Sequence, residues 1–186
     1  MPVDDLLESA QHRMDKSVET VREDFNSVRT GRASTALLDR ITVDYYGQRT
    51  LLKQLATIST PEPRLLSVQP FDPSSIKAVE KAIMESDLGL TPSNDGRAIR
   101  LPIPQLTEER RKELVKLVRH MAEECRVAVR NVRRDVIHHM KELSGSGEIG
   151  DDDERRAEER VQKLTDEHVK KIDELLKAKE TEIMEV

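Results

Sequence analysis

The sequence predicts an α+β protein in which a small α/β domain is inserted into an elongated antiparallel three-helix bundle. Two observations point to this fold. Apolar residues recur with a helical period in both flanks of the chain, and they alternate in short runs in the middle. Apart from Pro2, every proline lies between Pro61 and Pro104, so only the flanks are free to form long helices. We therefore expect a discontinuous bundle domain over residues 1–30 and 105–186 and an inserted domain over residues 31–104.

Three long helices are expected in the flanks. The first covers residues 6–28, and the second runs from Thr107 to about residue 143, where the run SGSG ends it. The third follows the acidic residues 151–154, whose charges suit a helix N-terminus. Each apolar seam is too narrow to be stable alone, so the helices are expected to bury their seams against one another. The seam residues are Leu7, Met14, Val18, Val21, Phe25 and Val28; Leu114, Val118, Met121, Cys125, Ala128, Val132, Val136 and Leu143; and Val161, Leu164, Val169, Ile172, Leu175, Leu176 and Ile183.

The inserted domain is expected to contain short strands and one helix. Residues 41–45 alternate between apolar and polar side chains before Gly47, which is typical of a hairpin. Further short strands are expected at residues 66–68 and 99–101. A helix is expected over residues 72–88, with an aspartate and a proline to start it and a glycine to close it.

Two stretches of chain, residues 29–34 and 102–105, are expected to join the domains. Gly31 makes the first stretch permissive, and two prolines stiffen the second. A paired connection of this kind is a candidate hinge, but a proline-rich linker can also fix an angle, and the residues leave both possibilities open. The candidate hinge residues are Thr30, Gly31, Arg32, Pro102, Pro104 and Gln105.

Arginines follow one side of the second predicted helix. At 100° per residue, Arg119, Arg126, Arg130 and Arg133 fall within about 60° of one another and away from the predicted seam. A guanidinium group presents a fork of donors that two phosphate oxygens can accept together, so an RNA-facing helix is one hypothesis. The alternative, which the pattern by itself favours, is an ordinary solvated face with glutamates 123 and 124 as ion-pair partners.

Composition narrows the classes of function. The chain of 186 residues carries a net charge of −5, so an anionic partner must be met by a local basic patch. Aromatic residues make up 2% of the chain, and Tyr45 and Tyr46 are expected mainly to pack on the surface, which argues against recognition by base stacking. No run approaches the roughly 18 to 20 apolar residues of a membrane span, and the acidic start lacks the features of a secretory signal. We expect a cytoplasmic protein without membrane contact.

Neither catalysis nor metal binding is predicted. Cys125 lies on a buried seam, where a thiolate would lack solvent access. His138 and His139 are adjacent, hence about 100° apart on a helix, and cannot point at one metal ion. Residues 147–153 lack the ligand spacing of an EF-hand loop, and no phosphate-binding P-loop motif occurs. We therefore expect a protein that is not an enzyme and uses no cofactor or metal.

Several separated motifs, taken together and in order, resemble the ribosome recycling factor family. They are RTGRAS at residues 29–34, DYYG at 44–47, DLGL at 87–90, LTEERRK at 106–112, VAVRNVRRD at 127–135 and QKLTD at 162–166. The resemblance covers essentially the whole chain. The paired histidines and the SGSG turn are less typical of the family.

The resemblance implies an L-shaped protein of two domains that binds the large ribosomal subunit after termination. With elongation factor G, and with GTP hydrolysis by that partner, such a protein splits the ribosome into subunits. It implies that Arg130 and Arg133 contact ribosomal RNA, with Arg111 and Arg29 as supporting contacts near the connection between the domains. It also implies that the inserted domain meets the elongation factor and moves relative to the bundle. We expect the chain to act as a monomer.

Two rival classes remain at this point. A scaffold that binds other proteins through its helical faces would have affinities insensitive to salt, whereas phosphate contacts weaken steeply as salt rises. An enzyme centred on the inserted domain would need convergent acid, base or nucleophilic groups, and none stands out in the sequence.

Overall fold

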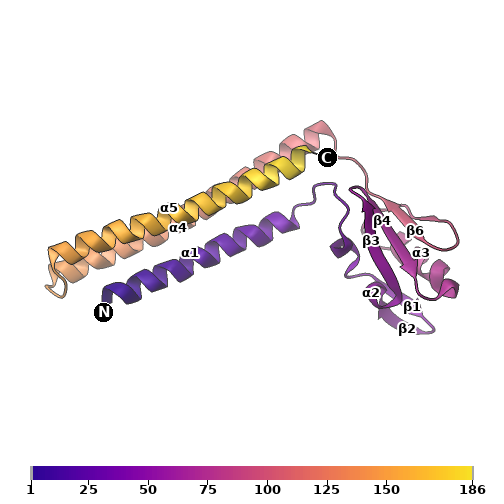
Figure 1. Ribbon diagram of the computed structural model, residues 1–186, viewed down its shortest axis with the longest axis horizontal. Helices are drawn as coiled ribbons and strands as arrows, with labels where there is room; N and C mark the ends of the chain where they lie inside the picture. Colours follow the sequence, from indigo (N-terminus) through magenta and orange to yellow (C-terminus); the bar gives the residue numbers. More distant parts are fainter. Residues whose placement is uncertain (1, 186) are drawn as a thin grey trace. The chain divides into compact units, whose positions relative to one another are not determined.

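The structure is a computed structural model in which residues 2–185 are described. The chain forms two compact units: residues 2–29 together with 108–185, and Thr30–Thr107 (Figure 1). The first unit is helical and the second contains antiparallel sheets, so the predicted α+β class is confirmed.

Three long helices make up the first unit. They are α1 (Pro2–Ser27), α4 (Glu108–Gly145) and α5 (Asp151–Met184), and each of them contacts the other two. The turn between α4 and α5 is closed by the backbone N–H groups of Glu148 and Ile149, which both donate to the carbonyl of Leu143. The helices and their antiparallel order are those predicted from the apolar seams.

The apolar seams bury as expected in α1 and in part in α4 and α5. All six predicted seam residues of the first helix are buried. On α4 the buried face also includes Ala122, Val129 and Met140, whereas Met121, Ala128 and Leu143 are only half-buried. The buried face is therefore rotated toward the arginine side relative to the prediction.

On α5 the predicted seam is buried at Val161, Ile172 and Ile183. Its other four residues are only half-buried: Leu164, Val169, Leu175 and Leu176. Three polar residues of α5 are also buried, where an apolar pattern could not reveal them: Thr165, His168 and Lys179.

A hairpin of β1 (Thr42–Tyr45) and β2 (Gln48–Leu51) opens the sheet structure of the second unit. Its two-residue turn places Tyr46 and Gly47 at φ of 49° and 80°, as a turn that follows strand twist requires. The predicted hairpin is confirmed. Tyr45 is half-buried and Tyr46 is exposed.

A separate four-stranded antiparallel sheet has the order β3-β4-β6-β5. The strands are β3 (Ala56–Glu62), β4 (Leu65–Pro70), β5 (Ser93–Asn94) and β6 (Ile99–Pro102). The predicted strands correspond to β4 and β6, the two central ones. The edge strands β3 and β5 were not predicted, because most of their side chains face solvent and carry no apolar alternation.

Short helical segments complete the second unit. They are a 3-10 turn at Thr35–Leu38, α2 (Leu52–Leu55), and α3 (Ile76–Met84) preceded by a 3-10 turn at Pro73–Ser75. Asp72 caps this last turn as predicted, because its carboxylate accepts the N–H of Ser74 at 2.9 Å. The prediction that the helix continues to residue 88 is wrong: α3 ends at Met84, and just beyond this end the Ser86 hydroxyl donates to the carbonyl of Ile83.

The core of the second unit lies between these elements and is fully apolar at its centre. Val43, Leu66, Val68, Ile99 and Leu101 are completely buried there, together with Val79 and Ile83 of α3.

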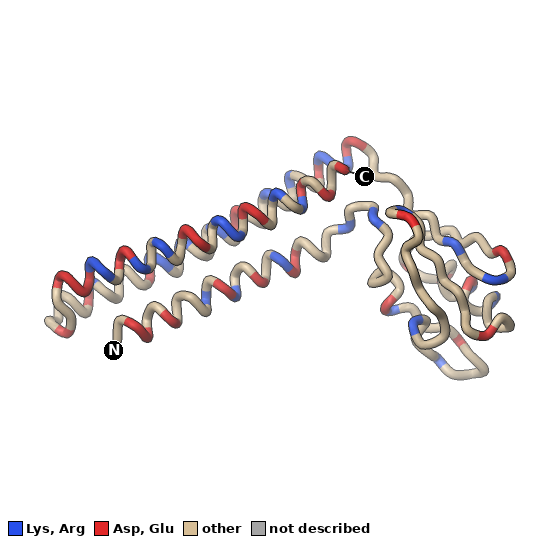
Figure 2. The backbone as a smooth tube through the Cα atoms, viewed as in Figure 1, with Lys and Arg blue, Asp and Glu red and all other residues tan. Residues whose placement is uncertain are grey.

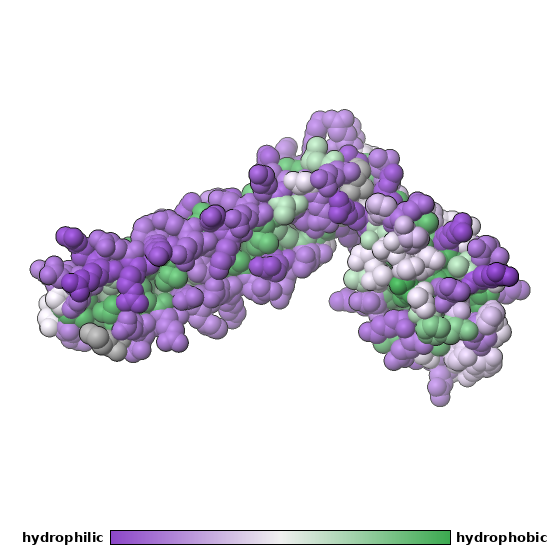
Figure 3. All heavy atoms as spheres, viewed as in Figure 1, coloured by the Kyte–Doolittle hydropathy of each residue, from purple (hydrophilic) through white to green (hydrophobic). Residues whose placement is uncertain are grey.

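The surface of the first unit is strongly charged. Lysines, arginines and acidic residues alternate along its helices (Figure 2), and hydrophilic side chains cover much of its visible surface (Figure 3). No helix within residues 2–185 combines the length and the apolar character that crossing a bilayer requires.

Candidate nucleic-acid interface

The candidate interface follows the row formed by Arg119, Arg126, Arg130 and Arg133 of α4, called the arginine row below. The prediction that this row faces away from the core is wrong in part. Arg119 is exposed, but the other three are half-buried, and Arg126 keeps only 18% of its side-chain surface accessible. The row lies on the flank of α4 that meets α5, because the buried face of α4 is rotated toward it.

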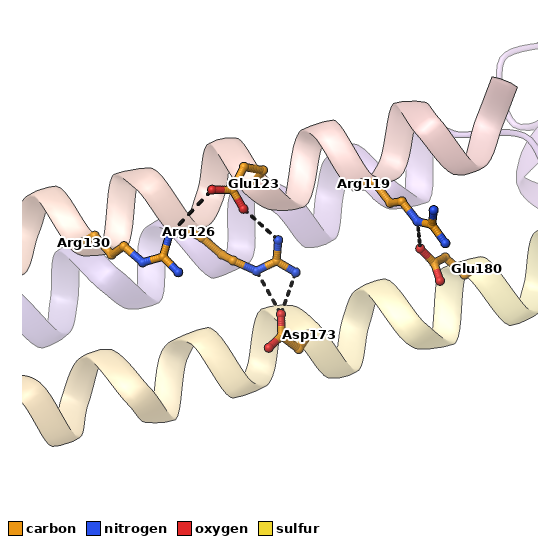
Figure 4. A network of polar contacts seen from close by, with 6 residues as sticks. All are labelled: Arg119, Glu123, Arg126, Arg130, Asp173 and Glu180. Atoms are coloured by element: carbon orange, nitrogen blue, oxygen red, sulfur yellow. Dashed lines mark hydrogen bonds and ion pairs between the residues drawn. The ribbon is translucent and has the colours of Figure 1, made fainter.

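Carboxylates of α5 bind the first two arginines of the row (Figure 4). The Nε of Arg119 donates to Glu180 at 2.6 Å. The Nε and Nη2 of Arg126 both donate to Oδ1 of Asp173, at 2.9 and 2.6 Å. These two guanidinium groups therefore bridge α4 and α5, and their charges are already compensated.

The pKa shifts of Arg119 and Arg126 agree with these ion pairs. The hydrogen bond from Arg119 to Glu180 raises the pKa of Arg119. Burial is the largest single influence on the pKa of Arg126 and lowers it, but hydrogen bonds and charge attraction to Asp173 and Glu123 together outweigh burial and leave the pKa raised. Both groups are held as cations by neighbouring carboxylates.

Arg130 is bound less closely. Its Nη1 lies 3.6 Å from Oε1 of Glu123, a carboxylate that also accepts from Arg126 at 3.0 Å. The side chain keeps 42% of its surface accessible. One carboxylate is thus shared by two guanidinium groups, and the charge of Arg130 is only partly compensated. Glu123 fills the ion-pair role that the alternative hypothesis expected, whereas Glu124 pairs with His120 instead.

Arg133 differs from the rest of the row because its partner on α5 is neutral. Its Nη1 donates to the side-chain carbonyl of Gln162 at 3.0 Å, and its Nε is buried with no hydrogen-bond partner within residues 2–185. The amide nitrogen of Gln162 in turn donates to Asp166 at 2.9 Å. The guanidinium group is therefore positioned by a hydrogen bond to an amide, and no carboxylate within residues 2–185 forms an ion pair with it.

Arginines of α4 and acidic residues of α5 share a matched spacing in the sequence, which the apolar pattern does not record. Arg119, Arg126 and Arg133 are seven residues apart, and so are residues 166, 173 and 180, all acidic. Two antiparallel helices bring such series into register, as heptad positions flanking an apolar seam do. The spacing indicates that the acidic residues of α5 lie opposite the arginines of α4, but it does not tell which of the three pairs form.

The two supporting arginines lie near the start of α4 and just after the end of α1. Arg111 is half-buried in the first turns of the helix, and its Nε is buried without a hydrogen-bond partner among the described residues. Arg29 follows the end of α1 and is exposed. Both belong to the first unit, at the end of the bundle where the chain leaves and returns (Figure 1).

The candidate hinge residues fall in three environments. Thr30 and Gly31 are buried, and Gly31 has a φ of 79°, which glycine adopts without strain. Pro102 is the last residue of β6 and pairs with Leu65, so it belongs to the sheet. The remaining candidates, Arg32, Pro104 and Gln105, are exposed.

The cysteine and the paired histidines, the other residues with potential for catalysis or metal binding, make contacts within the bundle. Cys125 is buried, its thiol donates to the carbonyl of Ser17, and burial raises its pKa to about 11. His138 pairs with Glu142, and His139 contacts the carbonyl of Asp135. Among residues 2–185 no cluster of histidine, cysteine and acidic side chains is arranged to hold a metal ion.

The fold and the arginine row define a class: two-unit α+β proteins whose three-helix bundle carries positioned cations along its longest helix. The family model described as "Ribosome recycling factor" matches residues 21–184 of the chain. The chain therefore belongs to the ribosome recycling factor family, as its motifs indicated.

Similar proteins match nearly its whole length. It is 59% identical to the ribosome-recycling factor of Rubrobacter xylanophilus over 180 residues, 97% of either chain. It is 57% identical to that of Alkaliphilus metalliredigens over 176 residues, 95% of either chain.

Solved structures agree with the family assignment. A solution structure of the ribosome recycling factor matches with a TM-score of 0.74 and 46% identity, covering 100% of this chain and 99% of the other. A second match comes from models for the T. thermophilus ribosome recycling factor and the E. coli elongation factor G bound to the E. coli post-termination complex. It has a TM-score of 0.62 and 47% identity, over 99% of this chain and 100% of that one.

Proposed function

We propose that the protein binds ribosomal RNA of the large subunit after termination and, with elongation factor G, splits the ribosome so that it can be reused. GTP hydrolysis by the elongation factor supplies the energy, and the protein acts as a monomer in the cytoplasm and is not an enzyme. Family membership supports this proposal, as does the related structure of a recycling factor with elongation factor G on a post-termination complex.

The proposed RNA contact rests on one observation: the positive charges of the arginine row are compensated unequally by carboxylates. Arg119 and Arg126 donate to carboxylates of α5 at 2.6 Å, whereas Arg133 donates to a neutral amide and Arg130 shares its carboxylate. An arginine without its own carboxylate has donors left for phosphate oxygens. Arg130 and Arg133 are therefore the RNA contacts, Arg111 and Arg29 support them, and Arg119 and Arg126 brace the bundle.

The connection between the two units serves as a hinge in this proposal. Residues 28–34 carry Gly31 at positive φ, and residues 103–107 lead from β6 into α4 outside any helix or strand. Motion about Thr30 to Arg32 and about Pro104 and Gln105 lets the second unit move when the elongation factor acts on it. Pro102 is anchored in the sheet and marks the edge of the moving part.

The test is a sedimentation assay of ribosome splitting. Post-termination ribosomes are mixed with elongation factor G and GTP, with and without the protein, and the yield of free subunits is measured on a sucrose gradient. A rise in free subunits that needs both factors and GTP supports the function. No rise, with a recycling factor of known activity as the positive control, contradicts it.

Salt dependence separates RNA binding from a protein-binding scaffold. Affinity for large subunits should fall steeply with salt, because every neutralised phosphate releases counterions. Arg133→Ala should weaken binding by about 1–3 kcal/mol and lower the salt slope by about one. Affinity that does not respond to salt or to this substitution would favour the scaffold.

A further inference from the structure

The register of α4 against α5 predicts a contact that the structure does not contain. Arg119 meets Glu180, and seven residues further along α4 Arg126 meets Asp173, seven residues back along α5. The next step of the same register would bring Arg133 to Asp166. A third ion pair would complete the series, and Arg133 would then be compensated like its neighbours.

Gln162 stands in the place of that third ion pair. Its side-chain carbonyl accepts Nη1 of Arg133 at 3.0 Å, and its amide nitrogen donates to Oδ1 of Asp166 at 2.9 Å. Within residues 2–185 no ion pair joins Arg133 to Asp166. The amide oxygen of Gln162 therefore accepts from Arg133 and its amide nitrogen donates to Asp166, so that the guanidinium group and the carboxylate do not meet.

We propose that Gln162 is a positioning residue that keeps Asp166 from pairing with Arg133, so that Arg133 is oriented and its charge remains available to an RNA phosphate. This inference rests on the proposed function and adds a second residue to it. The geometry also gives Asp166 a role: its bond to the amide nitrogen sets which end of the Gln162 amide faces Arg133. A carboxylate at position 162 would neutralise the arginine, and a small apolar residue would let Asp166 reach it.

The experiment compares Gln162→Ala with the double variant Gln162→Ala/Asp166→Asn. Affinity for purified large subunits is measured over a range of salt. Gln162→Ala should bind about tenfold more weakly at low salt, with a salt slope lower by about one, because Asp166 then compensates Arg133. The double variant should recover most of that affinity.

The size of the recovery by the second substitution separates the proposal from its alternatives. Asp166→Asn alone is measured beside these two variants, because removing a negative charge near the arginine row strengthens binding to RNA in any background. If Gln162 only supported the helix or only oriented Arg133, Asp166→Asn would raise affinity equally with and without Gln162, whereas the proposal requires a larger gain in the Gln162→Ala background. Gln11→Ala is the matched control, because Gln11 is exposed on α1 of the same bundle, and it should bind like the wild type. Unchanged binding of Gln162→Ala, or a double variant as weak as the single one, would overturn the proposal.

A second measurement needs no ribosome. Thermal unfolding of Arg133→Ala, Asp166→Asn and the two substitutions together measures the coupling between these side chains. The coupling should be small in the wild-type background, because the two side chains interact only through the amide of Gln162. It should be larger in the Gln162→Ala background, where the ion pair forms, and equal coupling in both backgrounds contradicts the role of Gln162. If instead Arg133→Ala binds large subunits as tightly as wild type, the RNA contact of the proposed function fails, and the melting data still decide the role of Gln162.

Discussion

Two nitrogens of Arg126, Nε and Nη2, donate to the same oxygen of Asp173, Oδ1, at 2.9 and 2.6 Å. This contact joins the longest helix of the bundle to its C-terminal helix through a side chain that is mostly buried. The arginine row therefore contains two kinds of residue. Some arginines bind carboxylates of α5 and stabilise the bundle, and others have no carboxylate of their own and keep N–H donors for a ligand.

Breaking this contact should affect stability more than RNA binding. Because the guanidinium group is mostly buried and Asp173 is half exposed, we expect a coupling of about 0.5–1.5 kcal/mol between Arg126→Ala and Asp173→Ala. Urea unfolding of the two single variants and the double variant measures it. Arg126→Ala should also bind large subunits more tightly than Arg133→Ala; the reverse order would contradict the division of the row.

His168 should be essential to the docking of α1 on α5. Its ring is 2% exposed, with Nδ1 2.7 Å from the carbonyl of Leu164 and Nε2 2.7 Å from the carboxylate of Asp15. Asp15→Ala would leave a buried nitrogen without its partner, so it should lower the free energy of unfolding by about 1–3 kcal/mol. Urea unfolding tests this. Glu8→Ala, an exposed acidic residue of the same helix, is the control and should have little effect.

Cys125 should react slowly with alkylating agents in the folded protein. Burial is the largest cause that raises its pKa from 9.0 to about 11, Asp24 adds to it, and Arg126 partly opposes it. At pH 8 the thiolate population is then about 100-fold smaller than in the unfolded chain, and access is limited as well. Iodoacetamide labelling followed by mass spectrometry, with and without urea, measures the ratio. Equal rates in both conditions would contradict a buried thiol.

The same shift sets a direction for stability at alkaline pH. A raised folded pKa means that the folded protein keeps the proton while the unfolded chain loses it. The stabilisation is complete below about pH 9 and is lost as the pH rises toward 11. Cys125→Ser is the comparison, and its stability should fall less over this interval.

Gly31 should matter for splitting and not for RNA binding. Its φ of 79° is closed to proline, whose ring fixes φ near −65°, so Gly31→Pro should distort the connection. We expect subunit splitting to fall while salt-dependent binding to large subunits survives. Gly89→Pro is a matched control, because Gly89 has a φ of 64° in the same unit but lies outside the connection. Equal losses of splitting in both variants would argue against a hinge.

The amino-acid sequence by itself determined those elements of the fold whose apolar residues recur at a regular spacing. The apolar period of residues 6–28 fixed α1, whose predicted seam is buried throughout, and the alternation around Val43 with a glycine turn fixed the hairpin. Separated motifs in order indicated the family. These features are local, and local spacing is what a sequence pattern records.

Only the tertiary structure decided how the arginines are used. On a helical wheel Arg126 and Arg133 lie close together and are equivalent, yet one meets a carboxylate and the other an amide. Which partner each meets depends on the register and rotation of α4 against α5, and these are set by the packing of apolar side chains on both helices. The role of His168 was hidden for the same reason: its partner Asp15 is distant in sequence and becomes a neighbour only when α1 and α5 pack.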